Sequence, residues 1–447
     1  MGILKKQKNK GEREDLPPHF SALFFVAVSL GLAWAMRGHF GHEWGASWAG
    51  AVGVLALVLV TGRRDWARKA PVLAVLGATG WGAGGMMSYG QVVGYCRSLS
   101  FPDALYGYTM LTVIGALYGF TGGGLTGLGL EEEEKKKADW ARLMAEMVAG
   151  AILAWGLLVY QMEWLMTPPR SELWAAMLGA AGALAWYLGR NGYHRALRTA
   201  AYSALGAGFG FSFGNLIQTL GSTSGLHYNW WNVMEFSLGF FGGLGMMWGV
   251  LTTSWPVSRP AGTTGNGIAA FLLFLFIPFT NLVNAMGSAR FMERATRLKL
   301  DVSPSFGTHQ MWAAAGVMLL FAILLMLAWR RWGGDEAQAR RRAVPALFFL
   351  ITLEYNLFAY LQLLFFRQPF SMGRSETLYI FILAALFFWW YAELRRKNAP
   401  PVDGGIQETP QRWTTILLLL VLVLLVLTFI SVHAHGPLPG AHERFRP

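Results

Sequence analysis

Long runs of apolar residues recur along the whole chain and are separated by short polar segments. Runs of about 18 residues or more are long enough to cross a membrane as an α-helix, which takes about 20 residues. The pattern therefore predicts an all-α polytopic membrane protein with about 13 transmembrane helices. The predicted spans are 20–37, 45–61, 71–89, 104–129, 143–165, 172–189, 199–219, 232–252, 267–287, 311–329, 344–365, 376–393 and 413–432.

A block of four apolar segments recurs about three times along the chain, which predicts three parallel repeats and a final C-terminal helix. Residues 32–34 and 153–155 are both Leu-Ala-Trp, and a glutamine stands near the outer end of the third segment of each block, at Gln91, Gln218 and Gln362. An even number of spans per block gives each copy the same orientation. The predicted parts are a cytoplasmic tail 1–18, repeat one 19–130, repeat two 143–252, a divergent repeat three 267–394, a cytoplasmic linker 395–412, a terminal transmembrane helix 413–433 and an outer tail 434–447.

The positive charges predict the orientation, because cytoplasmic loops of membrane proteins are enriched in lysine and arginine. With the N-terminus in the cytoplasm, more than two thirds of the 37 Lys and Arg residues lie on the inner side and the C-terminal tail lies outside. This bias predicts a bacterial-type inner (plasma) membrane protein. It also accounts for most of the net charge of +12 without a nucleic-acid partner. The expected partners are membrane lipids and a small solute or a lipid-linked substrate.

Composition excludes several kinds of chemistry. The chain is 54% hydrophobic and has one cysteine, Cys96, so neither an intrachain disulfide nor a cysteine-rich metal site can form. No Walker motif and no Gly-x-Ser-x-Gly elbow is present, and the glycine runs lie inside predicted spans. We therefore expect no cofactor.

Glycines dominate the packing signal of the first two blocks. Gly115, Gly119, Gly123 and Gly127 fall at steps of four and form a stripe along one helix. Small residues let helix backbones approach closely in lipid, where no hydrophobic force drives their association. We expect a tight glycine-packed core, with the bulkier third block leaning on it.

The first polar cluster follows the first span. Arg37, His39, His42 and Glu43 are a cation, two imidazoles and a carboxylate in one short connection, and the last three share a face if the segment is helical. Three interpretations stay open. They are a metal site, which needs a further ligand, a ligand or proton site, and a plain interfacial turn.

Further polar residues gather at the predicted outer ends of the spans, where they line an expected polar cavity. Buried polar groups in lipid are costly and usually face the protein interior. Glu235 and Glu354 are acidic residues inside otherwise apolar spans, and Arg290, Arg294 and Arg297 form one cationic stripe if helical. The candidate substrate-binding residues are Arg37, His39, Tyr89, Gln91, Asn215, Gln218, His227, Asn229, Asn232, Asn281, Asn284, Arg290, Glu354, Asn356 and Gln362.

These features favour a secondary transporter of a small polar, anionic or sugar-like solute, with Glu235 or Glu354 as a proton carrier and Arg37 as an anion ligand. A second interpretation is a transferase at the outer face that acts on a lipid-linked or sugar substrate. Its candidate catalytic residues are Glu43, His42 and Glu235, as base and proton carriers. A third is a non-catalytic scaffold subunit whose outer polar face is a docking surface.

Overall fold

The computed structural model describes residues 18–366, 374–394 and 409–445, and the regular elements in these ranges are all helices. Parts of the predicted cytoplasmic tail, the linker and the outer tail lie outside the described residues. A helix stands at each of the thirteen predicted positions. The first eight are α1 Pro18–Arg37, α2 His42–Thr61, α4 Ala70–Gly85, α6 Phe101–Glu131, α7 Trp140–Trp155, α8 Leu173–Arg190, α9 His194–Thr223 and α10 Trp230–Leu251.

The later helices belong to the bulkier part of the chain, together with several short pieces. They are α11 Thr263–Phe271 with η2 Leu272–Phe276 and α12 Ile277–Ala285, then α14 Phe306–Trp332, α16 Val344–Phe365, α17 Ser375–Trp389 with η4 Trp390–Leu394, and α18 Pro410–Ala434. The short pieces are α3 Arg64–Ala67, α5 Gly90–Cys96, η1 Gly156–Gln161, α13 Ser288–Arg297, α15 Glu336–Gln338 and η3 Ala339–Ala343.

Ten helices are long and apolar enough to cross a membrane, or eleven if α4 and α5 form one bent span. The chain is therefore an all-helical, multi-pass membrane protein. The count of about 13 is not confirmed, because α8 and α9 are not among these candidates. The sequence of α9 explains its lower hydropathy, since it carries serines, glycines and two amides that face the protein interior.

The contacts between six helices form a closed ring. In ring order they are α1, α2, α4, α6, α9 and α10, and α10 returns to α1. Four of them come from the first predicted block but only two from the second, whose α7 and α8 lie outside the ring. The three-repeat arrangement is not confirmed.

Trp81 of α4 fills the middle of the ring. Its indole is fully buried, and it lies where a Cβ atom on Gly50, Gly122 or Gly242 would be. These glycines belong to α2, α6 and α10, so one side chain is seated against three other helices. Its ring packs edge-on against Trp34 of α1, with 5.1 Å between centroids.

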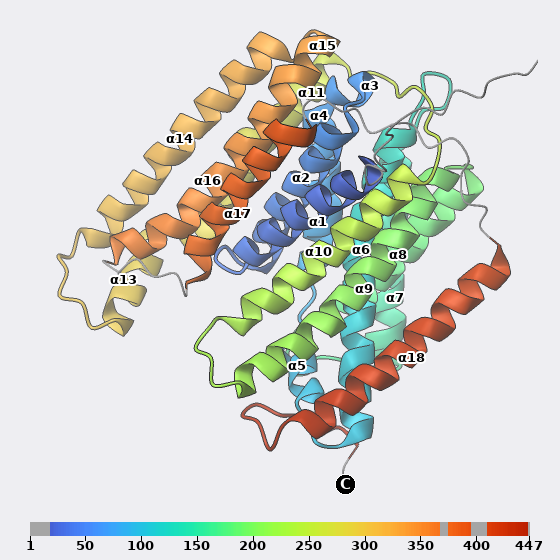
Figure 1. The fold of residues 1–447 in the computed structure, drawn as a ribbon, viewed down its shortest axis with the longest axis vertical. Coiled ribbons are helices and arrows are strands. Elements are labelled where there is room, and N and C mark those ends of the chain that lie inside the picture. Colours follow the sequence, from blue (N-terminus) through green and yellow to red (C-terminus); the bar gives the residue numbers. More distant parts are fainter. Residues whose placement is uncertain (1–17, 367–373, 395–408, 446–447) are drawn as a thin grey trace, which may run out of the picture.

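The glycine stripe of α6 packs on α9, as the sequence predicts. A Cβ atom on Gly115 or Gly119 would overlap backbone atoms of Ala207 or Ser203. Close backbone contact of this kind replaces side-chain interdigitation in a membrane bundle. The remaining helices pack around the ring, with α14, α16 and α17 on one side and α18 on the opposite side (Figure 1).

Candidate functional site

Three of the predicted site residues meet at a buried ion pair and a tyrosine hydroxyl. Nη2 of Arg37, the last residue of α1, lies 2.6 Å from Oε1 of Glu235 in α10 and donates to the Tyr89 hydroxyl at 2.6 Å. That hydroxyl donates in turn to Glu235 Oε1 at 2.8 Å. Each of the three residues is at most 2% exposed. The charges are therefore matched inside the bundle, as burial of an ion pair requires.

Only one carboxylate oxygen of Glu235 takes part in these hydrogen bonds. Oε1 also accepts from Trp231 Nε1 at 3.0 Å. Oε2 is buried and has no hydrogen-bond partner among the described residues. It lies 3.0 Å from where a Cβ atom on Gly38 would be, so the carboxylate approaches the backbone closely just after the end of α1.

The local sequence explains how these side chains meet. Asn229 caps α10 by accepting from the backbone N–H of Asn232, which puts Glu235 in the second turn of that helix. Tyr89 lies in the break between α4 and α5, where the two helix axes bend by 63°. Irregular backbone at membrane depth is tolerated where it lines a cavity or is buried in protein.

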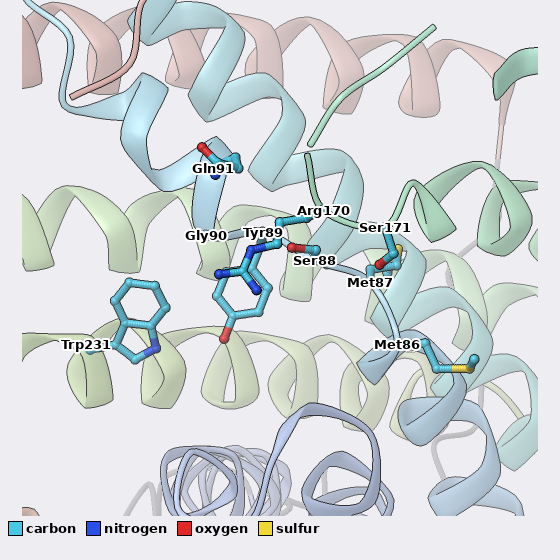
Figure 2. A pocket seen from close by; sticks show the side chains of 9 residues that line it. All are labelled: Met86, Met87, Ser88, Tyr89, Gly90, Gln91, Arg170, Ser171 and Trp231. Atoms are coloured by element: carbon cyan, nitrogen blue, oxygen red, sulfur yellow. The ribbon is translucent and has the colours of Figure 1, made fainter. Parts of the chain in front are cut away.

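A pocket of about 480 Å³ lies at this break (Figure 2). Its lining residues come from the break, the start of α5, the loop before α8 and the start of α10. They are Met86, Met87, Ser88, Tyr89, Gly90, Gln91, Arg170, Ser171 and Trp231. Tyr89 lines this pocket, its hydroxyl points toward α10 (Figure 2), and this hydroxyl donates to Glu235 of the buried ion pair.

Arg170 is the only charged residue in this lining, and the sequence interpretation missed it. Its loop is ordered by Glu172, whose carboxylate accepts from the backbone N–H groups of Met166 and Thr167 at 2.8 Å each. Within the described ranges no ion pair of Arg170 is found. It is the one basic residue in the sequence between α7 and α8, and this isolated positive charge could have indicated it as a candidate binding residue.

A second polar cluster joins α1 to the third block. His39 lies 3.7 Å from the Glu376 carboxylate of α17, and Gln362 of α16 accepts from Arg294 of α13 at 2.8 Å. Asn232 donates to the Tyr379 hydroxyl, which donates to a carbonyl of α1. Burial lowers the pKa of the His39 imidazole, and the nearby carboxylates offset part of this effect.

Four other predicted binding residues form hydrogen bonds outside the Arg37 cluster. Asn215 donates to Gln218 at 3.1 Å, so these two buried amides bind each other. Asn281 and Asn284 donate to backbone carbonyls one turn back. These bonds satisfy the amides only in part, because Oδ1 of Asn215 and Oδ1 of Asn281 are buried without a hydrogen-bond partner among the described residues. None of the four side chains is bonded to the Arg37 cluster.

The exposed loops also contribute less than expected. His227 and Asn229 are exposed, and Asn229 serves as the helix cap. Arg290 is exposed and lies 3.6 Å from Glu293, so the predicted arginine stripe is partly neutralised. Only Arg294 of that stripe turns toward the interior.

Glu354 and Asn356 on α16 are buried, and their side-chain polar atoms have no hydrogen-bond partner in the described residues. They stand apart from the Arg37 cluster. The side chains of His42 and Glu43 lie outside the part that the structure describes. No group of three or more His, Cys, Asp or Glu residues suited to a metal is found in the described ranges.

No protein-family model, no curated protein and no solved structure matches this chain. Its function therefore has to be inferred from the geometry and charge of the site itself.

Proposed function

We propose that this protein is a secondary transporter, proton-coupled, for a small polar solute of anionic or sugar-like chemistry. The observation behind the proposal is the broken helix α4–α5, whose linker lines a pocket. Tyr89 of this linker is hydrogen-bonded to the buried Arg37–Glu235 pair. Discontinuous helices around a polar site are a recurrent construction of secondary transporters. An anionic group suits the pocket because its one charged lining residue is Arg170.

Two buried acidic residues support the proposal of a coupling proton. Glu235 Oε2 and both carboxylate oxygens of Glu354 are buried without hydrogen-bond partners in the described chain. An ionised carboxylate without full solvation is costly inside a membrane protein, and a bound proton removes that cost. Loading and release of a proton at Glu235 would also change the charge that balances Arg37.

Transport currents test this proposal. Proteoliposomes on a solid-supported membrane receive concentration jumps of phosphate, monocarboxylates, dicarboxylates, sugar phosphates and neutral sugars. We expect a pH-dependent current with one class, and a loss of about tenfold or more in Glu235→Gln and in Glu354→Gln, equivalent to about 1.4 kcal/mol. Glu293→Gln is the matched control, because its carboxylate is half exposed.

The outcomes separate the two parts of the proposal. Full, pH-dependent currents in both variants would end the proton-coupling idea. No current and no solute-dependent pH change inside the vesicles, with any of these solutes, would end the proposal of a small polar transported solute. The pH change is needed because a monoanion that moves with one proton carries no net charge.

We further propose that the chain crosses a bacterial-type inner membrane thirteen times, with its N-terminus in the cytoplasm, its C-terminus outside and its spans in parallel blocks. The charge bias of the loops supports this orientation. The sharpest test concerns α9. Single cysteines replacing the exposed residues His194 and Ser224, in a Cys96→Ala background, are expected to react from opposite sides of the membrane. Labelling of both from one side contradicts the thirteen-span topology.

A transferase that works at the outer face on a lipid-linked or sugar substrate is the second candidate. One observation favours it. Below the site, the ring is closed by Trp34, Trp81 and Tyr118, and Trp34 lies 5.1 Å from each of the other two rings. A transporter must open this layer, whereas an enzyme need not. A new covalent product, formed by the purified protein from a lipid-linked sugar, would decide for the enzyme.

A further inference from the structure

A second pocket lies beside the polar one, on the lipid-facing side of the ring. It has a volume of about 340 Å³ and lies between α4, α6, α7 and α8. Its lining is apolar apart from threonine side chains, and includes Ala83, Leu125, Ala151 and Met177. Along α4 it runs from Thr79 to Met86, roughly 10 Å at 1.5 Å per residue.

The two pockets adjoin at Met86, which lines both. The apolar pocket is also lined by Leu173, three residues after Arg170 of the polar pocket. A ligand that fills both would therefore place a polar end beside Arg170, Ser88 and Gln91 and an apolar end along α4. That distribution is the one found in a lipid.

The apolar pocket is open sideways. Val148 and Ile152 of α7 line it and are 58% and 66% exposed, so this wall faces the surroundings of the helix bundle. In a membrane these surroundings are hydrocarbon chains. A chain can therefore enter from the bilayer without crossing the polar pocket.

The charge of Arg170 favours a lipid with an anionic headgroup. Arg170 is exposed, is the only charged residue of the polar pocket, and has no ion pair within the described ranges. Arginine binds phosphate and carboxylate groups through its planar fork of donors. A neutral headgroup would leave this cation unmatched.

We propose that the joint pocket binds an anionic amphiphile from the surrounding bilayer. Its phosphate or carboxylate lies at Arg170 and one hydrocarbon chain lies in the groove between α4 and the α7–α8 pair. This inference rests on the proposed function and changes its substrate class, because the transported solute is then an anionic amphiphile and not a small polar anion.

Binding in nanodiscs of neutral phosphatidylcholine tests the proposal, with native mass spectrometry as the readout. The probes are dodecyl phosphate, inorganic phosphate and dodecanol. We expect dodecyl phosphate to bind about tenfold or more tightly than either other probe, since only it uses both pockets. Arg170→Ala is expected to weaken both phosphates. Ala176→Trp, which fills the groove, should weaken dodecyl phosphate alone.

Leu178→Trp is the matched control, because Leu178 lies on the same helix as Ala176, is exposed and does not line the groove. Unchanged dodecyl phosphate binding in Ala176→Trp would overturn the proposal. Inorganic phosphate binding as tightly as dodecyl phosphate would also overturn it and leave a site for a small free anion. Tight dodecyl phosphate binding without its transport, measured as a current or as a pH change inside proteoliposomes, would instead contradict the transporter proposal and keep the amphiphile site.

Discussion

Arg37→Met is expected to destabilise the folded protein by about 3–5 kcal/mol, because it leaves the Glu235 carboxylate buried without its counter-charge. Arg37 is 1% exposed and Glu235 is 2% exposed, so water cannot replace the lost partner. The methionine side chain keeps much of the volume next to Trp34 and Tyr89. The loss is therefore mainly electrostatic and not a cavity effect.

Reversible unfolding in mixed detergent micelles measures this loss. The double variant Arg37→Met with Glu235→Met removes both charges and is expected to return most of the stability, because apolar replacement of a whole buried pair is often neutral. The two residues share one hydrogen-bonded network, so their effects should not add. The same double variant should lose transport, since neither the anion partner nor the carboxylate remains.

Arg290→Met is the control for the removal of a membrane-protein arginine. Arg290 is exposed and forms a surface pair with Glu293, which is worth at most about 1 kcal/mol. An Arg37→Met variant as stable as Arg290→Met would show that the Arg37–Glu235 pair is not a buried structural element.

Trp81→Ala should cost about 3–5 kcal/mol, the usual loss for emptying a large aromatic site in a core. The site cannot collapse easily, because Gly50, Gly122 and Gly242 already bring three helix backbones against the indole. The side chain also loses its edge-on contact with Trp34. The layer that closes the ring below the candidate site would then contain a void.

Thermal unfolding of Trp81→Ala beside Trp186→Ala checks this prediction. Trp186 lies on α8 and is 66% exposed, so its truncation removes a lipid-facing ring without emptying a core site. Trp81→Phe should fall between the wild type and Trp81→Ala. Equal losses for the two tryptophan-to-alanine variants would contradict the central position of Trp81.

The structure supports the sequence interpretation where the signal was local. A helix stands at each predicted position, because a long apolar run and its polar ends are properties of a single segment, although α8 and α9 are not among the candidate membrane spans. The glycine stripe of α6 also predicted a contact face correctly, since a step of four residues fixes one side of a helix. The sequence also indicated Arg37, Tyr89 and Glu235 as separate candidates, because exposing a polar side chain to lipid costs free energy.

Only the tertiary structure showed which buried polar residues are hydrogen-bond or ion-pair partners. Arg37 and Glu235 are separated by 198 positions in the sequence, whereas Asn215 is hydrogen-bonded to Gln218, three residues away. In the sequence, each of these residues appeared only as a polar residue expected to be buried. The partner of such a group depends on which helix faces it, and the closed ring sets that order. The same assembly brought Arg170 and Tyr89 into the lining of one pocket and placed an apolar pocket next to it. The sequence alone determined a helical membrane protein with a glycine-packed core, whereas the packing of distant helices decided where its polar residues meet.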